Sequence, residues 1–284
     1  MDARIAKRHN IHVSGDGPVT LIFVHGLGTG QQVWHPIAPA FSDRYRVVLV
    51  DLMGCAGARL VTDELARYET LDGHAADLVD IAAMFHPGRT VLVVHSVGAM
   101  IGLLADLKAP QLFDAHVMVA PSPCYMNLPG YEGGFEPAAI EGFMTAIDQD
   151  IPAWAQAMAP AMMGDVPPGP LSAQLVDMLC QADPRALRRF ARATFMCDMR
   201  DQLPSLVKPV AVLQCTNDMV APLAVGRYMR ARLPDCNLSL IDCAGHFPQL
   251  RAPQQCIDAT AAFLDSLGLL GGAPLPAVAA LGSA

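Results

Sequence analysis

The stretch VLVVHSVGA at residues 91–99 decides how this sequence is interpreted. Its apolar first half is typical of a buried strand, and it turns through HSVG at residues 95–98 directly into a segment compatible with a helix. A serine at such a junction sits on a strained turn, with its hydroxyl above the carboxyl end of the sheet. Gly98 and Ala99 are small enough for strand and helix to approach closely. We therefore interpret Ser96 as a candidate nucleophile.

One position in this stretch departs from the usual pattern. Nucleophiles of this kind are commonly framed as G-x-S-x-G, and the sequence has Val94 at the place of the first glycine. Taken alone, this departure weakens the motif and leaves open the alternative of a serine that merely belongs to the core. We expect the β-branched side chain to crowd the turn that holds Ser96.

Short apolar runs of strand length recur along the chain, and helix-compatible segments such as residues 71–85 and 100–108 lie between most of them. Strands that alternate with helices predict an α/β fold, with a mostly parallel sheet covered by helices on both faces. The strand-like runs are residues 19–24, 47–50, 91–94, 115–119, 210–213 and 238–241.

One interval is too long for a single crossover between strands. Residues 120–209 separate two neighbouring runs, and they contain helical stretches divided by prolines and rich in methionine and aromatic residues. This pattern predicts an inserted helical cap. The expected division is an α/β core at residues 1–123 and 195–267, a helical cap at 124–194 and a flexible tail at 268–284.

Two further residues, Asp218 and His246, occupy positions typical of the acid and the base of a serine hydrolase. Asp218 and His246 each follow a predicted strand, so the chain order is serine, aspartate, histidine at one edge of a parallel sheet. His246 is then the base for Ser96, and Asp218 orients its ring. His25 and His95 compete for the base role by residue type alone, but both belong to turns that follow other strands. This chemistry requires no metal and no organic cofactor.

The glycine-rich turn FVHGLG at residues 23–28 follows the first strong strand. Such a turn supplies one backbone N–H of an oxyanion hole, and the amide after the nucleophile supplies the other, which nominates Leu27 and Val97. An ordinary strand-to-helix turn is the simpler alternative for residues 23–28. The candidate residues of a substrate pocket are His25, His95, Phe135, Trp154, Met158, Phe195 and Phe247, although packing between cap helices is the alternative for those in the insert.

Composition excludes several classes of protein. The formal net charge is −8, which disfavours nucleic acid or an anionic membrane as a partner. Hydrophobic residues make up 52% of the chain and charged residues 16%, as expected of a compact fold. The 8 cysteines form no C-x-x-C pair, and no apolar segment follows the first basic residues, so we expect reduced thiols and a cytoplasmic protein.

Together, these residues resemble the α/β-hydrolases that include the bacterial stress-response regulator RsbQ and the plant strigolactone and karrikin receptors. The resemblance extends over roughly residues 8–266. One loop departs from it, because GCAG at residues 54–57 replaces the family's usual Gly-x-Gly. The segments that carry the resemblance are RHN (8–10), VW (33–34), APAF (38–41), YETLDG (68–73), HSVGA (95–99), APSPCY (120–125), GGFE (133–136) and LQC (213–215) with Asp218.

The resemblance implies an α/β-hydrolase fold, a cap of four helices over a mostly apolar cavity, and slow hydrolysis tied to signalling. It supports the same triad, Ser96, Asp218 and His246. Three functions stay open: a hydrolase of a small apolar ester or lactone, a ligand receptor that acts on a regulator containing a PAS domain, and an inactive protein that keeps only the fold.

Overall fold

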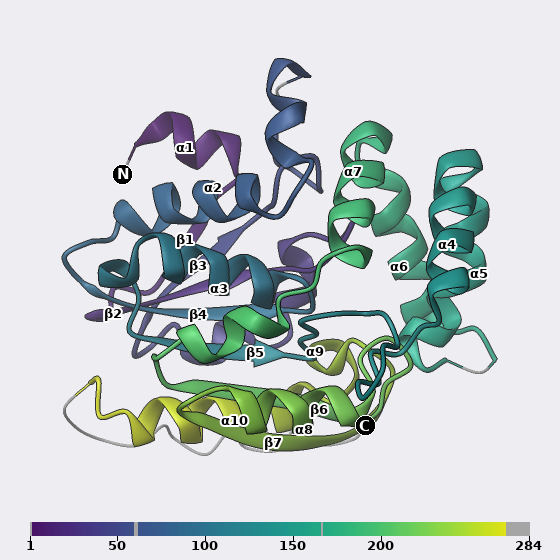
Figure 1. Cartoon of the computed structure of the whole chain (residues 1–284). Helices are drawn as coiled ribbons and strands as arrows, with labels where there is room; N and C mark the ends of the chain where they lie inside the picture. Colours follow the sequence, from purple (N-terminus) through teal and green to yellow (C-terminus); the bar gives the residue numbers. More distant parts are fainter. Residues whose placement is uncertain (1, 60–61, 166, 271–284) are drawn as a thin grey trace, which may run out of the picture.

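A computed structural model of the chain describes residues 2–59, 62–165 and 167–270 (Figure 1). Its centre is a seven-stranded sheet with the strand order β1-β3-β2-β4-β5-β6-β7. Strands β2 to β7 pair in parallel, and only β1 is antiparallel, at one edge next to β3. The strands are β1 (His12–Ser14), β2 (Val19–Val24), β3 (Arg46–Val50), β4 (Arg89–His95), β5 (Ala115–Val119), β6 (Val210–Asn217) and β7 (Cys236–Ala244).

The predicted strands all form, and the mostly parallel sheet is confirmed. Every residue of β2 and β5 is buried, as a parallel sheet between two layers of helices requires. The edge strand β1 was not predicted, because its three residues are all exposed and carry no apolar pattern.

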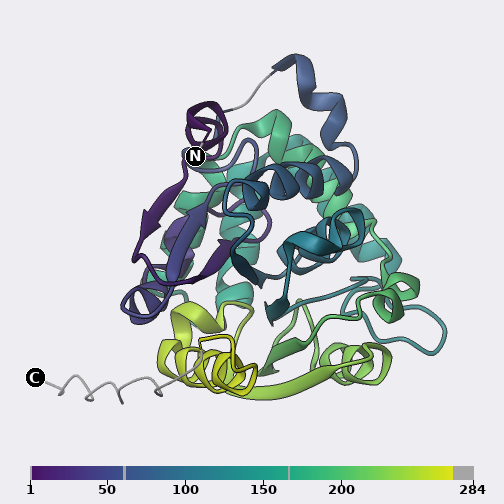
Figure 2. The same ribbon diagram turned by 90° about the vertical axis from the view of Figure 1, so that its left-hand side faces the viewer.

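Helices cover both faces of the sheet, and α8 and α10 lie on either side of the β6–β7 edge (Figure 2). Helix α2 packs against α3, and α3 follows β4 at the predicted serine turn. These core helices are α1 (Ala3–Arg8), α2 (Asp72–Ala83), α3 (Gly98–Lys108), α8 (Leu223–Arg232), α9 (Pro248–Arg251) and α10 (Pro253–Ser266).

Four helices are inserted between β5 and β6 and stand together beyond the end of the sheet (Figure 1). Each has a proline in its first turn, where the missing N–H would have no helical partner. They are α4 (Pro137–Gln149), α5 (Ile151–Met163), α6 (Pro170–Gln181) and α7 (Pro184–Phe195), and we call these four helices and their connections the cap. The division into a core and a cap domain at residues 124 and 194 stays a prediction.

The expected flexible tail, residues 268–284, lies outside the described residues from position 271 onward. Within the described ranges, no helix combines the length and the apolar character that crossing a bilayer would need.

Candidate active site

Ser96 occupies the turn between β4 and α3. Its φ angle is +56°, a left-handed conformation that a non-glycine residue adopts only under constraint. Its N–H donates to the carbonyl of Val119 at 2.9 Å, which ties the turn to the neighbouring strand β5. At Gly98, a Cβ atom would lie 2.7 Å from the carbonyl oxygen of His25, so glycine is required for this close approach. The geometry is that of the elbow expected from the sequence.

Val94 is fully buried beneath this turn. One of its γ carbons lies 3.4 Å from the place where a Cβ of Gly102 would stand on helix α3. Because Gly102 has no side chain, the helix can approach β4 over Val94. Cδ1 of Leu92 lies 3.2 Å from the same position, so the glycine on the helix leaves room for both Leu92 and Val94 on the strand.

Ser96, His246 and Asp218 form a continuous chain of hydrogen bonds. The Oγ of Ser96 lies 2.7 Å from Nε2 of His246, and Nδ1 of His246 lies 2.7 Å from Oδ2 of Asp218. A neutral ring with its proton on Nδ1 donates to the carboxylate and accepts from the hydroxyl, which is the tautomer that a general base needs. All three side chains are buried.

The carboxylate of Asp218 is held by the backbone that follows it. Its Oδ1 atom accepts hydrogen bonds from the N–H groups of Val220 at 2.8 Å and Ala221 at 3.1 Å. These bonds hold the carboxylate in place and leave Oδ2 for His246. Because β6 and β7 are parallel neighbours, Asp218 and His246 emerge at the same edge of the sheet.

The turn before Leu27 is fixed by His25. The N–H of Leu52 donates to Nε2 of His25 at 2.9 Å, so the proton of the neutral ring is on Nδ1, which donates to the carbonyl of Gly26 at 2.8 Å. Burial lowers the pKa of His25, which keeps the ring neutral. Thr29 also donates to the carbonyl of Gly26, at 3.3 Å.

The hydrogen bond from His25 orients the Gly26–Leu27 peptide next to Ser96. In a planar trans peptide the N–H points opposite to the preceding carbonyl, so the N–H of Leu27 points away from the ring of His25. Among the described residues, neither the Leu27 amide nor the Val97 amide donates to a protein acceptor. Both are therefore available to a substrate oxygen, as an oxyanion hole requires.

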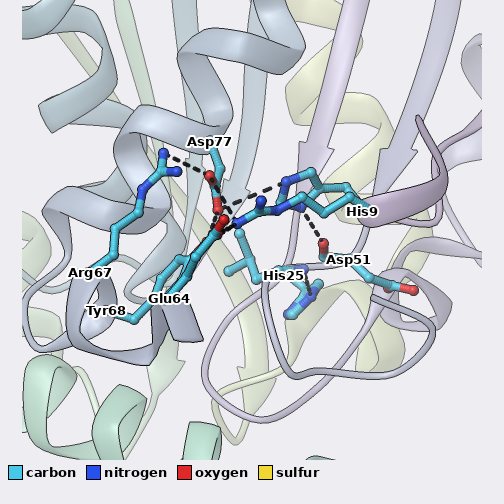
Figure 3. Close-up of polar contacts among 9 residues, drawn as sticks. His9, His25, Asp51, Glu64, Arg67, Tyr68 and Asp77 are labelled. Carbon is cyan, nitrogen blue, oxygen red and sulfur yellow. Dashed lines mark hydrogen bonds and ion pairs between the residues drawn. The ribbon is translucent and has the colours of Figure 1, made fainter. Parts of the chain in front are cut away.

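A polar cluster centred on Asp77 lies behind this turn (Figure 3). The hydroxyl of Tyr68 donates to Asp77 at 2.7 Å, and Arg67 forms an ion pair with it at 2.9 Å. His9 lies 3.8 Å from the same carboxylate, and its Nδ1 is 3.2 Å from the carbonyl of Asp51. The cluster thus joins the N-terminal segment to the end of β3, from which Leu52 reaches His25.

The cavity beside Ser96 is small, with a free volume of about 20 Å³. This is room for about one water molecule, whereas small-molecule pockets usually measure roughly 300–1,000 Å³. The hydroxyl of Tyr125 lies inside it, 3.2 Å from Oγ of Ser96. The lining residues are Leu27, His95, Ser96, Tyr125, Met162, Thr194, Phe195, Val220, His246 and Phe247.

His95, Phe195 and Phe247 therefore line the cavity, but four other predicted pocket residues do not. His25 faces the back of its own turn, and Phe135 packs behind Phe195, with ring centroids 6.2 Å apart. Trp154 and Met158 border a separate hollow between α4 and α5. These four side chains lie outside the cavity beside Ser96 in this structure, because the rotation of a cap helix relative to the sheet is set by packing between elements.

Several lining residues were missed by the sequence analysis. Tyr125 belongs to the segment APSPCY at residues 120–125, whose resemblance to the family was a usable signal. Val220 follows Asp218 so closely that its position was also accessible. Met162 and Thr194 had no comparable signal.

Across the described ranges, no cluster of three or more histidine, cysteine or acidic side chains is arranged to hold a metal ion.

Comparisons with known proteins agree with this geometry. A family model described as the alpha/beta hydrolase family matches residues 21–259. The chain is 36% identical over 255 residues to strigolactone esterase D14 of Arabidopsis thaliana, covering 88% of this chain and 94% of the relative. It is 32% identical to karrikin insensitive 2 receptor CA of Petunia hybrida, covering 89% and 94%. A hydrolase structure from Oleispira antarctica aligns with a TM-score of 0.85 and 29% identity, covering 95% of this chain and 97% of that one.

Proposed function

The chain belongs to the alpha/beta hydrolase family, and from this premise we propose that it is a serine hydrolase that cleaves a small apolar carboxylic ester or lactone. The resemblance to the plant strigolactone and karrikin receptors is confirmed by the comparisons. One observation carries the proposal: the unbroken hydrogen-bond chain from Ser96 through His246 to Asp218, on a serine with a left-handed backbone.

The proposed reaction follows from these contacts. The Oγ of Ser96 attacks the substrate carbonyl while Nε2 of His246 removes its proton, and Asp218 stabilises the charged ring. The N–H groups of Leu27 and Val97 donate to the oxyanion that develops. The protonated His246 then donates to the leaving oxygen, which leaves an acyl group on Ser96. Water, activated by His246, hydrolyses this acyl enzyme and restores the serine.

The cavity favours a neutral, apolar substrate. Aside from the candidate catalytic residues, its lining is mostly apolar, and it includes no lysine, arginine or glutamate side chain. A charged group placed there would lose its hydration without gaining a partner. Because the free volume is about 20 Å³, an ester or lactone fits only after the cap or the side chains that line the cavity have moved.

The direct test is labelling with a fluorophosphonate followed by intact mass spectrometry. We expect the wild-type protein to gain one adduct, with Ser96→Ala as the unlabelled control. Absence of the adduct from the wild type, under conditions that label an established serine esterase, would contradict an activated Ser96.

A second candidate function is a ligand receptor whose hydrolysis is slow or occurs once per molecule. It is favoured by the similarity to karrikin insensitive 2 receptor CA and by the sequence resemblance to RsbQ, which suggests a regulator with a PAS domain as the partner. The turnover number separates the two functions. Rapid repeated turnover supports the enzyme, whereas stoichiometric product together with ligand-dependent binding of such a regulator, measured by calorimetry, supports the receptor.

A further inference from the structure

The loop that carries His246 is bonded to the cap as well as to the core. The backbone N–H of His246 donates to the carbonyl of Met162 near the end of α5, at 2.6 Å. The side chain of Met162 also lines the cavity beside Ser96. One residue of the cap therefore contacts both the substrate space and the backbone of the candidate base.

Two glycines allow this contact. At Gly245 a Cβ atom would lie 2.4 Å from the carbonyl oxygen of Met163, and at Gly164 it would lie 2.6 Å from the carbonyl carbon of Ala244. Both glycines have positive φ angles, +95° for Gly245 and +68° for Gly164. The two backbones therefore pack directly on each other, and a side chain at either position would separate them.

An ion pair closes the same junction from the outside. Arg251, the last residue of α9, donates to Oδ1 of Asp165, which follows α5. The other carboxylate oxygen of Asp165 accepts from the N–H and the hydroxyl of Ser172, at 3.1 and 2.9 Å, in the first turn of α6. Asp165 thus joins the turn between α5 and α6 to the short helix that begins two residues after His246.

The size of the cavity makes this junction relevant to catalysis. A substrate enters only if part of the cavity lining moves, and Met162 of the cap and Phe247 of the core lie on opposite sides of the junction within that lining. A shift that carries Met162 away breaks its hydrogen bond to the His246 backbone. The base then loses a support that its ring contacts with Ser96 and Asp218 do not replace.

We propose that the Asp165–Arg251 ion pair is a positioning device that clamps the cap turn at residues 162–165 onto the His246 loop, so that the base is aligned only while the cap is seated. This inference rests on the proposed function, because it assigns His246 the role of base. Neither Asp165 nor Arg251 touches the substrate space, and both act through the backbone of Met162 and His246.

The test compares Arg251→Gln with Arg251→Lys, which keeps the charge, and with Asp165→Asn, which keeps an oxygen for Ser172. The matched control is Arg44→Gln, which removes an ion pair to Asp265 of similar exposure away from the site. For Arg251→Gln and Asp165→Asn we expect kcat to fall about tenfold, since small displacements of a catalytic group have effects of this size, while KM changes less. Arg251→Lys should restore most of the loss, and Arg44→Gln should keep the wild-type kcat.

Hydrogen exchange supplies a readout that does not depend on activity. In Arg251→Gln, amides of residues 159–165 and 244–251 should lose protection together, whereas the control should not change them. Faster exchange in the cap turn alone, or a lower melting temperature with wild-type kcat, would overturn the proposal. If the wild type itself fails to react with the fluorophosphonate, the proposed function fails instead, and the exchange experiment still decides whether the two segments are coupled.

Discussion

Val94 packs against helix α3 at Gly102, with a γ carbon 3.4 Å from the position of the missing Cβ, next to Leu92, whose Cδ1 lies 3.2 Å from that position. From the sequence alone, a β-branched residue at this position is expected to crowd the serine turn. In the structure Val94 is fully buried, and the helix that faces it has its smallest residue, Gly102, at the point of contact.

The first prediction follows from this pair. Val94→Gly should lower the free energy of unfolding by about 2 kcal/mol, because a buried side chain is lost and the strand gains conformational freedom when unfolded. The activity of each folded molecule should persist. Urea denaturation and active-site titration measure the two effects. In a double-mutant cycle, Gly102→Ala should restore part of the stability that Val94→Gly loses, whereas Gly102→Ala alone should not stabilise the wild type. A folded variant with more than a tenfold loss of activity would mean that Val94 shapes the site directly.

Ser96→Ala should reduce the hydrolysis of p-nitrophenyl acetate by on the order of 10³-fold or more, because the attacking oxygen is lost while alanine still fits the turn. The melting temperature serves as the check that the fold persists. If the variant keeps more than a tenth of the wild-type activity, another residue is the nucleophile.

His25→Ala should lower kcat by up to about 100-fold, the lower end of what removal of an oxyanion donor causes, because the Gly26–Leu27 peptide loses its main orienting bond. The N–H of Leu52 also loses its acceptor, so stability should fall as well. Thr29→Val is the matched control, since it removes the longer bond of 3.3 Å to the same carbonyl, together with a 3.4 Å contact to Nδ1 of His25, and keeps the His25 ring. Equal losses of kcat in both variants would contradict the role assigned to the His25 ring.

Tyr125→Phe should lower kcat/KM by about fivefold, since one neutral hydrogen bond contributes about 1 kcal/mol. Burial raises the pKa of Tyr125 well above its ordinary value, so its hydroxyl stays protonated and donates to Ser96. Steady-state kinetics with a short ester measure the effect. A loss as large as that of Ser96→Ala would make Tyr125 part of the catalytic chemistry.

Stability should fall in acid because of His74. Burial lowers the pKa of this histidine to about 3, and its ring lies between Tyr68 and Phe190, with neither nitrogen bonded to a described residue. The unfolded chain binds the proton near pH 6.5, so the contribution of His74 to stability is complete above that pH and is lost between pH 6.5 and about 3.

At pH 5, this loss should amount to about 2 kcal/mol relative to neutral pH. His74→Phe removes the titrating group and keeps the aromatic contacts, so it should stabilise the protein more at pH 5 than at pH 7. Urea denaturation at both pH values checks this, and an equal effect at the two would exclude His74 as a source of acid sensitivity.

The order of the elements and the positions of the triad residues could be predicted from the sequence, because both depend on local patterns. A buried parallel strand needs a continuous apolar run, as in residues 91–94, and residues that follow such strands meet at one edge of the sheet. Ser96, Asp218 and His246 could therefore be placed together from their positions alone. The exposed strand β1 could not be found in this way, since pairing with β3 defines it and no apolar pattern marks it.

Contacts between elements were decided only by the tertiary structure. Trp154 and Met158 are residue types that often line pockets. The rotation of α5 nevertheless turns them toward another hollow and brings Met162 to the cavity. The same packing places Gly164 on Gly245 and Asp165 beside Arg251, residues about 80 positions apart in the chain. Local periodicity specifies which side chains share a helix face, whereas the surface that each face meets depends on how all helices pack at once.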